Sequence, residues 1–143
     1  MKIICDSAVL SKVCSNIQRS VSNKSTIPAL EGILIEAENG QLKLTGYDLE
    51  VGAIVVIDCD VYSEGNAKNL CDILRMVPDD TVTIESDERN ICKIKSGEAE
   101  YSLIGTSTDD YPELPSLGKF SPVLVRRDIL KDMIRKTIFS VST

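Results

Sequence analysis

The chain has 143 residues, a formal net charge of −6, no histidine, no tryptophan and 43% apolar residues. This length supports one hydrophobic core and is too short for two full domains. The acidic balance excludes a protein that coats nucleic acid non-specifically, because phosphate is repelled wherever basic side chains are not gathered. No stretch approaches the about 18 consecutive apolar residues that span a membrane, and the start lacks a signal-peptide apolar region, so we expect a cytoplasmic protein.

The first predicted elements are a short strand over Met1–Cys5 and a helix from about Ser7 to Val21. The helix has one apolar stripe at the i, i+3, i+4, i+7 spacing, formed by Leu10, Val13, Cys14, Ile17 and Val21. The opposite face carries Lys12, Asn16 and Arg19. The pattern therefore predicts a helix that buries one side and presents cations on the other.

Three strand-like runs follow this helix, over Gly32–Glu38, Gln41–Tyr47 and Val51–Asp60. Asn39 and Gly40 separate the first two runs, and this dipeptide is a strong signal for a tight hairpin turn. Apolar and polar residues alternate from Gln41 onward, which is typical of a sheet with one buried face. The first part of the chain is therefore a β-α-β-β-β unit.

The same succession returns in the second part of the chain. A helix is predicted from roughly Ala67 to Val77, with an apolar stripe of Leu70, Ile73, Leu74 and Val77 and a polar face of Lys68, Asp72 and Arg75. Three strands follow, over Thr81–Ser86, Ile91–Lys95 and Glu98–Gly105. The repeat differs only at its start, because residues 63–66 leave no room for a strand of about five residues before Ala67. Either this copy lacks its first strand, or some of the residues that would form it are missing.

From Thr106 to Pro122 the composition changes to Ser, Thr, Asp, Pro and Gly, which predicts a linker or a domain-closing loop. A third helix is predicted to begin near Asp128 as its N-cap. It would bury Ile129, Leu130, Met133, Ile134 and Ile138, and show Lys131, Asp132, Arg135 and Lys136 to solvent. Three helices thus have basic outer faces, which suggests contact with a polyanion. The alternative is that these are ordinary solvated faces, since Asp72 and Asp132 lie among the cations.

Other kinds of chemistry find little support in the sequence. The five cysteines, Cys5, Cys14, Cys59, Cys71 and Cys92, are widely spaced in apolar runs and are interpreted as buried reduced thiols. Asp48 and Glu50 suggest a turn cap more than a metal site, and no cofactor or metal is expected. No histidine, nucleophile elbow or phosphate loop is present, so we expect no enzymatic activity.

Several stretches, taken together and in order, resemble the bacterial DNA polymerase III beta subunit, the sliding clamp family. They are Ser25–Leu30, Leu42–Glu50, Ala67–Pro78, Tyr111–Pro115 and Ile134–Ser140. The resemblance implies an α+β DNA-clamp fold, a duplicated β-α-β-β-β unit with two helices packed on antiparallel sheet. It also implies a ring of two head-to-tail protomers with three similar domains each, which encircles duplex DNA and tethers the replicative DNA polymerase.

Residues that match the DNA-facing positions of clamps are Lys12, Lys24, Lys68 and Arg75, with Arg19, Arg135 and Lys136 added from helix phase. The resemblance implies that residues 1–120 form the N-terminal clamp domain and that 121–143 begin a truncated middle domain. The polymerase and the clamp loader would then bind outside this segment, and the full-length protein would be a homodimer. Ring closure would use the strand around Glu98–Gly105. The alternative is an α+β protein-interaction module without DNA binding.

Overall fold

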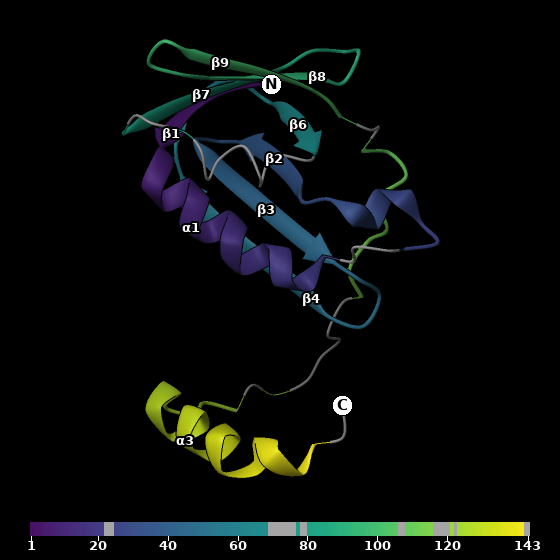
Figure 1. The fold of residues 1–143 in the computed structure, drawn as a ribbon, viewed down its shortest axis with the longest axis vertical. Coiled ribbons are helices and arrows are strands. Elements are labelled where there is room, and N and C mark those ends of the chain that lie inside the picture. The colour runs from purple at the N-terminus through teal and green to yellow at the C-terminus, as the bar shows by residue number, and fades with distance from the viewer. Residues whose placement is uncertain are drawn as a thin grey trace.

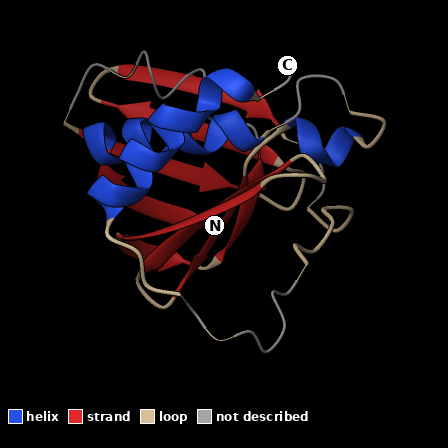
Figure 2. Cartoon of the chain, turned by 90° about the horizontal axis from the view of Figure 1, so that it is seen from below, coloured by secondary structure: helices blue, strands red, loops and turns tan. Residues whose placement is uncertain are grey.

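The computed structural model describes residues 1–21, 25–68, 77, 80–105, 108–115, 121 and 123–141. Figure 1 shows two β-sheets, with helix α1 lying across one side of them, and the same arrangement is seen turned by 90° in Figure 2. The elements are β1 (Lys2–Asp6), α1 (Ser7–Ile17), β2 (Leu34–Glu38), β3 (Gln41–Tyr47), β4 (Gly52–Asp58), β5 (Asp60–Ser63), β6 (Gly65–Lys68), β7 (Thr81–Ser86), β8 (Ile91–Ser96), β9 (Ala99–Ile104) and α3 (Arg127–Thr137). The α+β prediction is confirmed.

Every strand pairs antiparallel with its neighbours, in the orders β5-β1-β7-β8-β9 and β4-β3-β2-β6. The first strand of each repeat is exchanged between the sheets. β1 pairs with β7 of the second repeat, and β6 pairs with β2 of the first. This exchange joins the two repeats through backbone hydrogen bonds, so each sheet contains strands of both repeats.

The expectation that the second repeat lacks its first strand is wrong. Residues 65–68 form β6, which pairs with β2 from Leu34 to Ala37. Gly65 makes the turn from β5 with a φ of +147°, and a Cβ there would lie 3.1 Å from the Met1 nitrogen. Ala67 and Lys68 are consequently strand residues and not the start of a helix, while residues 69–76 of that predicted helix lie outside the described part of the chain.

Helix α1 begins where the sequence predicts, and its regular turns end at Ile17, followed by a 3-10 turn over Gln18–Ser20. Asp6 is the N-cap, and its carboxylate accepts a hydrogen bond of 2.8 Å from the Val9 amide. The helix and both sheets enclose one core, whose fully buried aliphatic side chains include Ile3, Leu10, Ile17, Ile35, Leu42, Leu44, Ile84 and Ile94. The apolar stripe of α1 is therefore what fixes the helix to the sheets.

The predicted hairpin between β2 and β3 is confirmed, since Asn39 and Gly40 both have positive φ, at +52° and +76°. This conformation at both central residues matches the twist of the flanking strands. The described residues of the predicted linker, 108–115, have no helix or strand. They lie against sheet residues, because the Tyr111 hydroxyl donates to the Thr45 carbonyl at 3.2 Å and Leu114 packs on Gly52.

The third predicted helix forms, but two expectations about it are wrong. Its N-cap is Arg126, and Asp128 lies within the first turn, paired with Arg126 at 2.6 Å. Its apolar face is not buried: Leu130 and Ile134 are 46% and 50% exposed, and α3 has no buried residue. In Figure 1 it lies apart from the two sheets.

Three of the predicted buried thiols, Cys5, Cys14 and Cys92, are confirmed as buried and are in no disulfide. Cys59 is free but half-buried, and Cys71 lies outside the described residues. Burial raises the pKa of Cys5 to about 12 and that of Cys92 to about 11. Among the described helices, none is long and apolar enough to span a membrane.

Candidate nucleic-acid interface

The outer face of α1 is the basic surface that the structure describes most completely. Lys12, Asn16 and Arg19 are exposed, while Leu10, Cys14 and Ile17 on the opposite side are buried. The predicted division of the helix into two faces is therefore confirmed. Residues 7 to 30 contain three cations and no carboxylate, although the chain as a whole has 22 acidic residues against 16 basic ones. This segment is a local exception to the acidic surface.

The two cations on this face differ from three cations of the sheets. On the sheets, Lys2 pairs with Glu85 at 2.7 Å, Lys43 with Glu36 at 2.8 Å, and Lys95 with Glu100 at 3.6 Å. Neither Lys12 nor Arg19 forms an ion pair with any carboxylate in the described part of the chain. Within that part of the chain no close carboxylate neutralises their charge, which is the condition under which a surface cation attracts phosphate.

The remaining predicted DNA-facing residues are placed less completely. Lys68 lies on β6, opposite Leu34 of β2, so the prediction that it belongs to a helix is wrong. The reason is that pairing with β2 holds the segment extended. Lys24 and Arg75 lie outside the described residues. Of the two weaker candidates on α3, Lys136 pairs with Asp132 at 2.6 Å, while Arg135 has no ion pair within the described chain.

Two residues that the sequence reasoning missed position this face. Asp6 caps α1, and an Asp directly before an amphipathic run is a recognisable N-cap signal. Gly46 on β3 allows the end of the helix to approach the sheet, because a Cβ at this position would lie 2.6 Å from the Ile17 Cγ2 and 2.9 Å from its carbonyl oxygen. No sequence signal distinguishes Gly46 from other strand glycines.

The acidic residues considered as metal ligands serve the backbone. The Asp48 carboxylate accepts hydrogen bonds from the amides of Val51 at 2.6 Å and Glu50 at 2.9 Å, and these two bonds lower its pKa. It therefore caps the turn between β3 and β4, as the sequence interpretation favoured. The described residues contain no cluster of three or more His, Cys, Asp or Glu placed to hold a metal ion.

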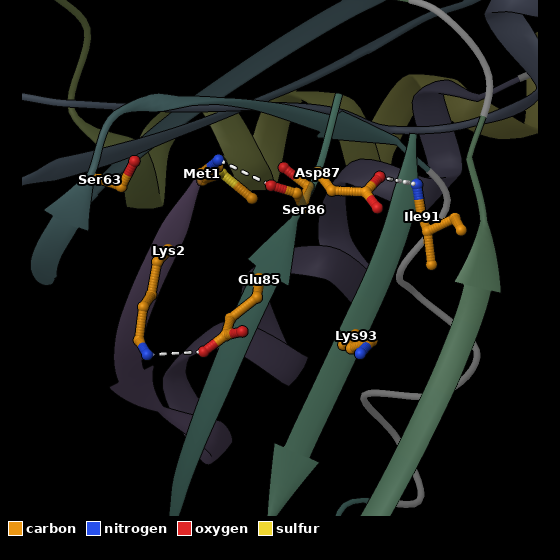
Figure 3. A pocket seen from close by; sticks show the side chains of 8 residues that line it. All are labelled: Met1, Lys2, Ser63, Glu85, Ser86, Asp87, Ile91 and Lys93. Atoms are coloured by element: carbon orange, nitrogen blue, oxygen red, sulfur yellow. Dashed lines mark hydrogen bonds and ion pairs between the residues drawn. The ribbon is translucent and has the colours of Figure 1, made fainter. Parts of the chain in front are cut away.

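A cavity of about 260 Å³ lies at the end of sheet β5-β1-β7-β8-β9, and its polar groups are mostly bonded to one another (Figure 3). The Met1 ammonium donates to the Ser86 carbonyl at 2.9 Å, and Asp87 accepts from the Ile91 amide at 2.9 Å. The Lys2–Glu85 pair lies beside them, and this hydrogen bond raises the pKa of Lys2 and lowers that of Glu85. These polar groups bind one another, which is an arrangement that stabilises a sheet end.

Comparison with known proteins gives a consistent result. Residues 1–115 match the family model described as DNA polymerase III beta subunit, N-terminal domain. The whole chain aligns with the beta sliding clamps of Bacillus subtilis (31% identity, 41% of that protein) and Synechocystis (32%, 40%). The alignment with the B. subtilis protein extends over 155 residues, so the chain is shorter than the matching part of that relative.

Solved structures give the same picture. The crystal structure of the B. subtilis DNA polymerase sliding clamp matches all of the chain and 41% of that protein, with a TM-score of 0.94 at 30% identity. A DNA polymerase III beta subunit from Eubacterium rectale matches 97% of the chain and 39% of that protein, with a TM-score of 0.91 at 33% identity. The chain thus spans about 40% of the length of the relatives that it matches.

Proposed function

Because the chain belongs to the DNA polymerase III beta subunit family, the bacterial sliding clamps, we propose that it is part of a processivity factor that encircles duplex DNA. The proposal extends to a non-catalytic role in the cytoplasm, as an accessory subunit that keeps a replicative polymerase on its template. The observation that carries it is the outer face of α1, which gathers exposed cations that pair with no carboxylate of the described residues, on an otherwise acidic chain.

A clamp that slides must hold DNA without reading its sequence. Lys12 and Arg19 fit this requirement, because they are exposed on one helical face and their mobile side chains can meet successive phosphates through water. Lys24, Lys68 and Arg75 complete the proposed DNA-facing set from the resemblance. Few and loose contacts of this kind bind phosphate weakly, so retention on DNA would come from ring closure.

The start and end of the described chain support the proposed division into domains, 1–120 and 121–143. Both α1 and α3 are 11 residues long, are followed by a three-residue 3-10 turn, and then by an extended valine, Val21 or Val141. Leu130 and Ile134 occupy the same positions in α3 as Leu10 and Cys14 do in α1, where both side chains are buried. This correspondence supports α3 as the first helix of a second copy of the same domain.

The proposed assembly is a head-to-tail homodimer. β9 forms one edge of its sheet and therefore has backbone groups that another strand can pair with, as ring closure would require. The replicative polymerase and the clamp loader would bind elsewhere in such a protein. The structure of a Helicobacter pylori beta clamp bound to a DNA ligase peptide has been solved. This chain aligns with 34% of that clamp at 21% identity.

The DNA contact is tested by titrating the ¹⁵N-labelled chain with a duplex oligonucleotide at low salt and following amide shifts by NMR. We expect weak binding, with shifts concentrated on α1, and a salt dependence equivalent to about two or three phosphates, that is, a log–log slope of about −2 to −3. The double variant Lys12→Glu/Arg19→Glu should lose these shifts, because it replaces both attractive charges with repulsive ones.

The matched control is Lys43→Glu/Lys95→Glu, which changes the net charge by the same amount on the paired cations of the sheets. It should keep the α1 shifts if the contact is local. Equal loss in both double variants would show a non-specific effect of net charge, and native spectra unchanged by DNA would exclude the α1 contact. The first result would refute a local contact through α1, and the second would favour a protein-interaction module without DNA binding.

A further inference from the structure

Cys59 lies at the point where the chain passes from one sheet to the other. Its predecessor Asp58 pairs with Gln41 of β3, and its successor Asp60 pairs with Ile4 of β1. The Cys59 amide donates to the Gly40 carbonyl at 3.0 Å, at the hairpin turn before β3. One residue therefore connects β4 in one sheet with β5 in the other.

The register of β1 and β5 brings a second cysteine to this point. Ile3 pairs with Val61 and Ile4 with Asp60, where the ladder ends. Cys5 and Cys59 are the next residues of the two segments, so continuing this register by one position sets them opposite each other. Directly opposed residues in antiparallel strands have Cα atoms about 4.5 to 5.5 Å apart. This range falls inside the about 4.4 to 6.8 Å that a disulfide requires between its Cα atoms.

The two side chains also share a face of the sheet. Alternation along β1 places Cys5 on the same side as Ile3, which is in the core, and alternation along β5 places Cys59 with Val61. Cys59 and Val61 pack against the same core that contains Cys5. Both cysteines also line one shallow cavity of about 350 Å³, and the nearby Cys59 contributes to the raised pKa of Cys5. Register, face and cavity therefore agree.

We propose that Cys5 and Cys59 are a redox modification site, at which a peroxide converts two thiols into a disulfide that links β1 to the crossing between the sheets. Cys59, the half-buried thiol, reacts first. Its thiolate attacks one oxygen of the peroxide, the O–O bond breaks, and a sulfenic acid forms with release of hydroxide. The Cys5 thiolate then attacks that sulfur, the S–S bond forms, the S–O bond breaks and a second hydroxide leaves. The two hydroxides take up the protons that the two thiols lost, which gives two molecules of water.

The described chain explains why this pair is selected. Cys14 and Cys92 are almost completely buried. Cys92 lies opposite Ser86 on one side and Leu103 on the other, so no cysteine faces it across either strand. Burial, Asp60 and Asp58 raise the pKa of Cys59, so little thiolate exists at neutral pH and oxidation is expected to be slow.

The bond would have a structural effect that a surface disulfide lacks. It would fix β5, a four-residue edge strand, to β1 at the residue where the chain changes sheets. Closing the loop between residues 5 and 59 also restricts the unfolded chain. The oxidised chain should consequently melt at a higher temperature than the reduced chain, and a reductant such as dithiothreitol should reverse the change.

Peptide mapping tests the proposal directly, because all five cysteines lie on different tryptic peptides. Those of Cys5 and Cys59 span residues 3–12 and 44–68. The folded chain is treated with hydrogen peroxide at mildly alkaline pH, the remaining thiols are alkylated, and the digest is analysed by mass spectrometry without reduction. We expect the 3–12 and 44–68 peptides to be linked, and the number of free thiols to fall from five to three.

Two variants make the result decisive. Cys59→Ser should lose the linkage and the shift in melting temperature, whereas Cys92→Ser, on β8 of the same sheet, should keep both. Circular dichroism of the reduced variants checks that each is folded, and if Cys59→Ser unfolds, Cys59→Ala replaces it. The proposal is overturned if five thiols survive peroxide, if oxidation stops at sulfinic acid on Cys59, or if the linked peptides carry Cys14, Cys71 or Cys92. This site is independent of the DNA contact, so either proposal can fail alone.

Discussion

Replacing Gly46 with alanine should destabilise the chain by disturbing the packing of the end of α1 against β3. The added Cβ would lie 2.6 Å from the Ile17 Cγ2, 2.9 Å from the Ile17 carbonyl oxygen and 3.2 Å from the Val21 Cγ2. A side chain can rotate away, but the carbonyl belongs to the last turn of the helix and moves only if that turn moves. The clash therefore displaces the end of the helix that carries Arg19.

The magnitude follows from two opposing contributions. Overpacking a well-filled site costs about 1 to 3 kcal/mol. The reduced freedom of the unfolded chain returns about 0.4 to 1 kcal/mol, since the φ of Gly46 is not in the left-handed region and alanine can adopt it. The net loss should be about 1 to 2 kcal/mol, or a decrease in Tm of about 5 to 12 °C for a folded unit of this size.

Urea unfolding followed by circular dichroism measures this loss, and a double-mutant cycle assigns it. In an Ile17→Ala background the Cγ2 contact no longer exists, so Gly46→Ala should cost less there, while the carbonyl contact leaves part of the penalty. Gly40→Ala is a useful comparison, because its Cβ would meet nothing within 4 Å and its cost comes only from a φ of +76°. A Gly46→Ala chain as stable as the native one, or an unchanged cost in the Ile17→Ala background, would refute the reasoning.

Substitutions at four further positions test other parts of the structure. Asp6→Ala removes the N-cap of α1 and should cost about 1 kcal/mol in urea unfolding, whereas Asp6→Asn should cost little. Tyr111→Phe removes the hydroxyl that binds the Thr45 carbonyl; burial raises the pKa of Tyr111 to about 12, so the folded state keeps a proton that the unfolded state loses near pH 10. Native stability should therefore fall between about pH 10 and 12, and Tyr111→Phe should lack that part of the decrease. In a pH titration followed by absorbance at 295 nm, the native chain should show a tyrosine that ionises near pH 12, and Tyr111→Phe should not. Leu130→Ala on exposed α3 should change stability by less than about 0.5 kcal/mol, while Leu10→Ala at the corresponding core position should cost about 2 to 5 kcal/mol, and equal costs would contradict the exposed placement.

Features that depend on residues close together in the sequence were predicted better than features that depend on contacts between distant segments. The stripe of α1 and the turn at Asn39 and Gly40 are local patterns, and each was predicted correctly. The alternation of β3 holds from Gln41 to Leu44 and ends at Thr45, which is buried. β6 was missed because its four residues, Gly, Asn, Ala and Lys, have low strand propensity. They become a strand only because β2 offers backbone partners, which is an interaction with residues more than 25 positions earlier.

The candidate site divides in the same way. The basic face of α1 follows from helical spacing, because one stripe must be buried and Lys12 and Arg19 fall outside it. The carboxylate partners of Lys2, Lys43 and Lys95 on the sheets depend on which residues face each other across strands, and spacing along one segment carries no such information.

The sequence by itself determined helix α1 with its buried side, the hairpin at Asn39 and Gly40, and the family resemblance, since each rests on patterns of residues close together in the chain. Tertiary structure alone decided the exchange of β1 and β6 between the sheets, the need for glycine at position 46 and the opposition of Cys5 and Cys59. Each of these is a contact between distant segments. Such contacts are selected by the packing of the whole core and the pairing of whole strands, so no local window of residues encodes them.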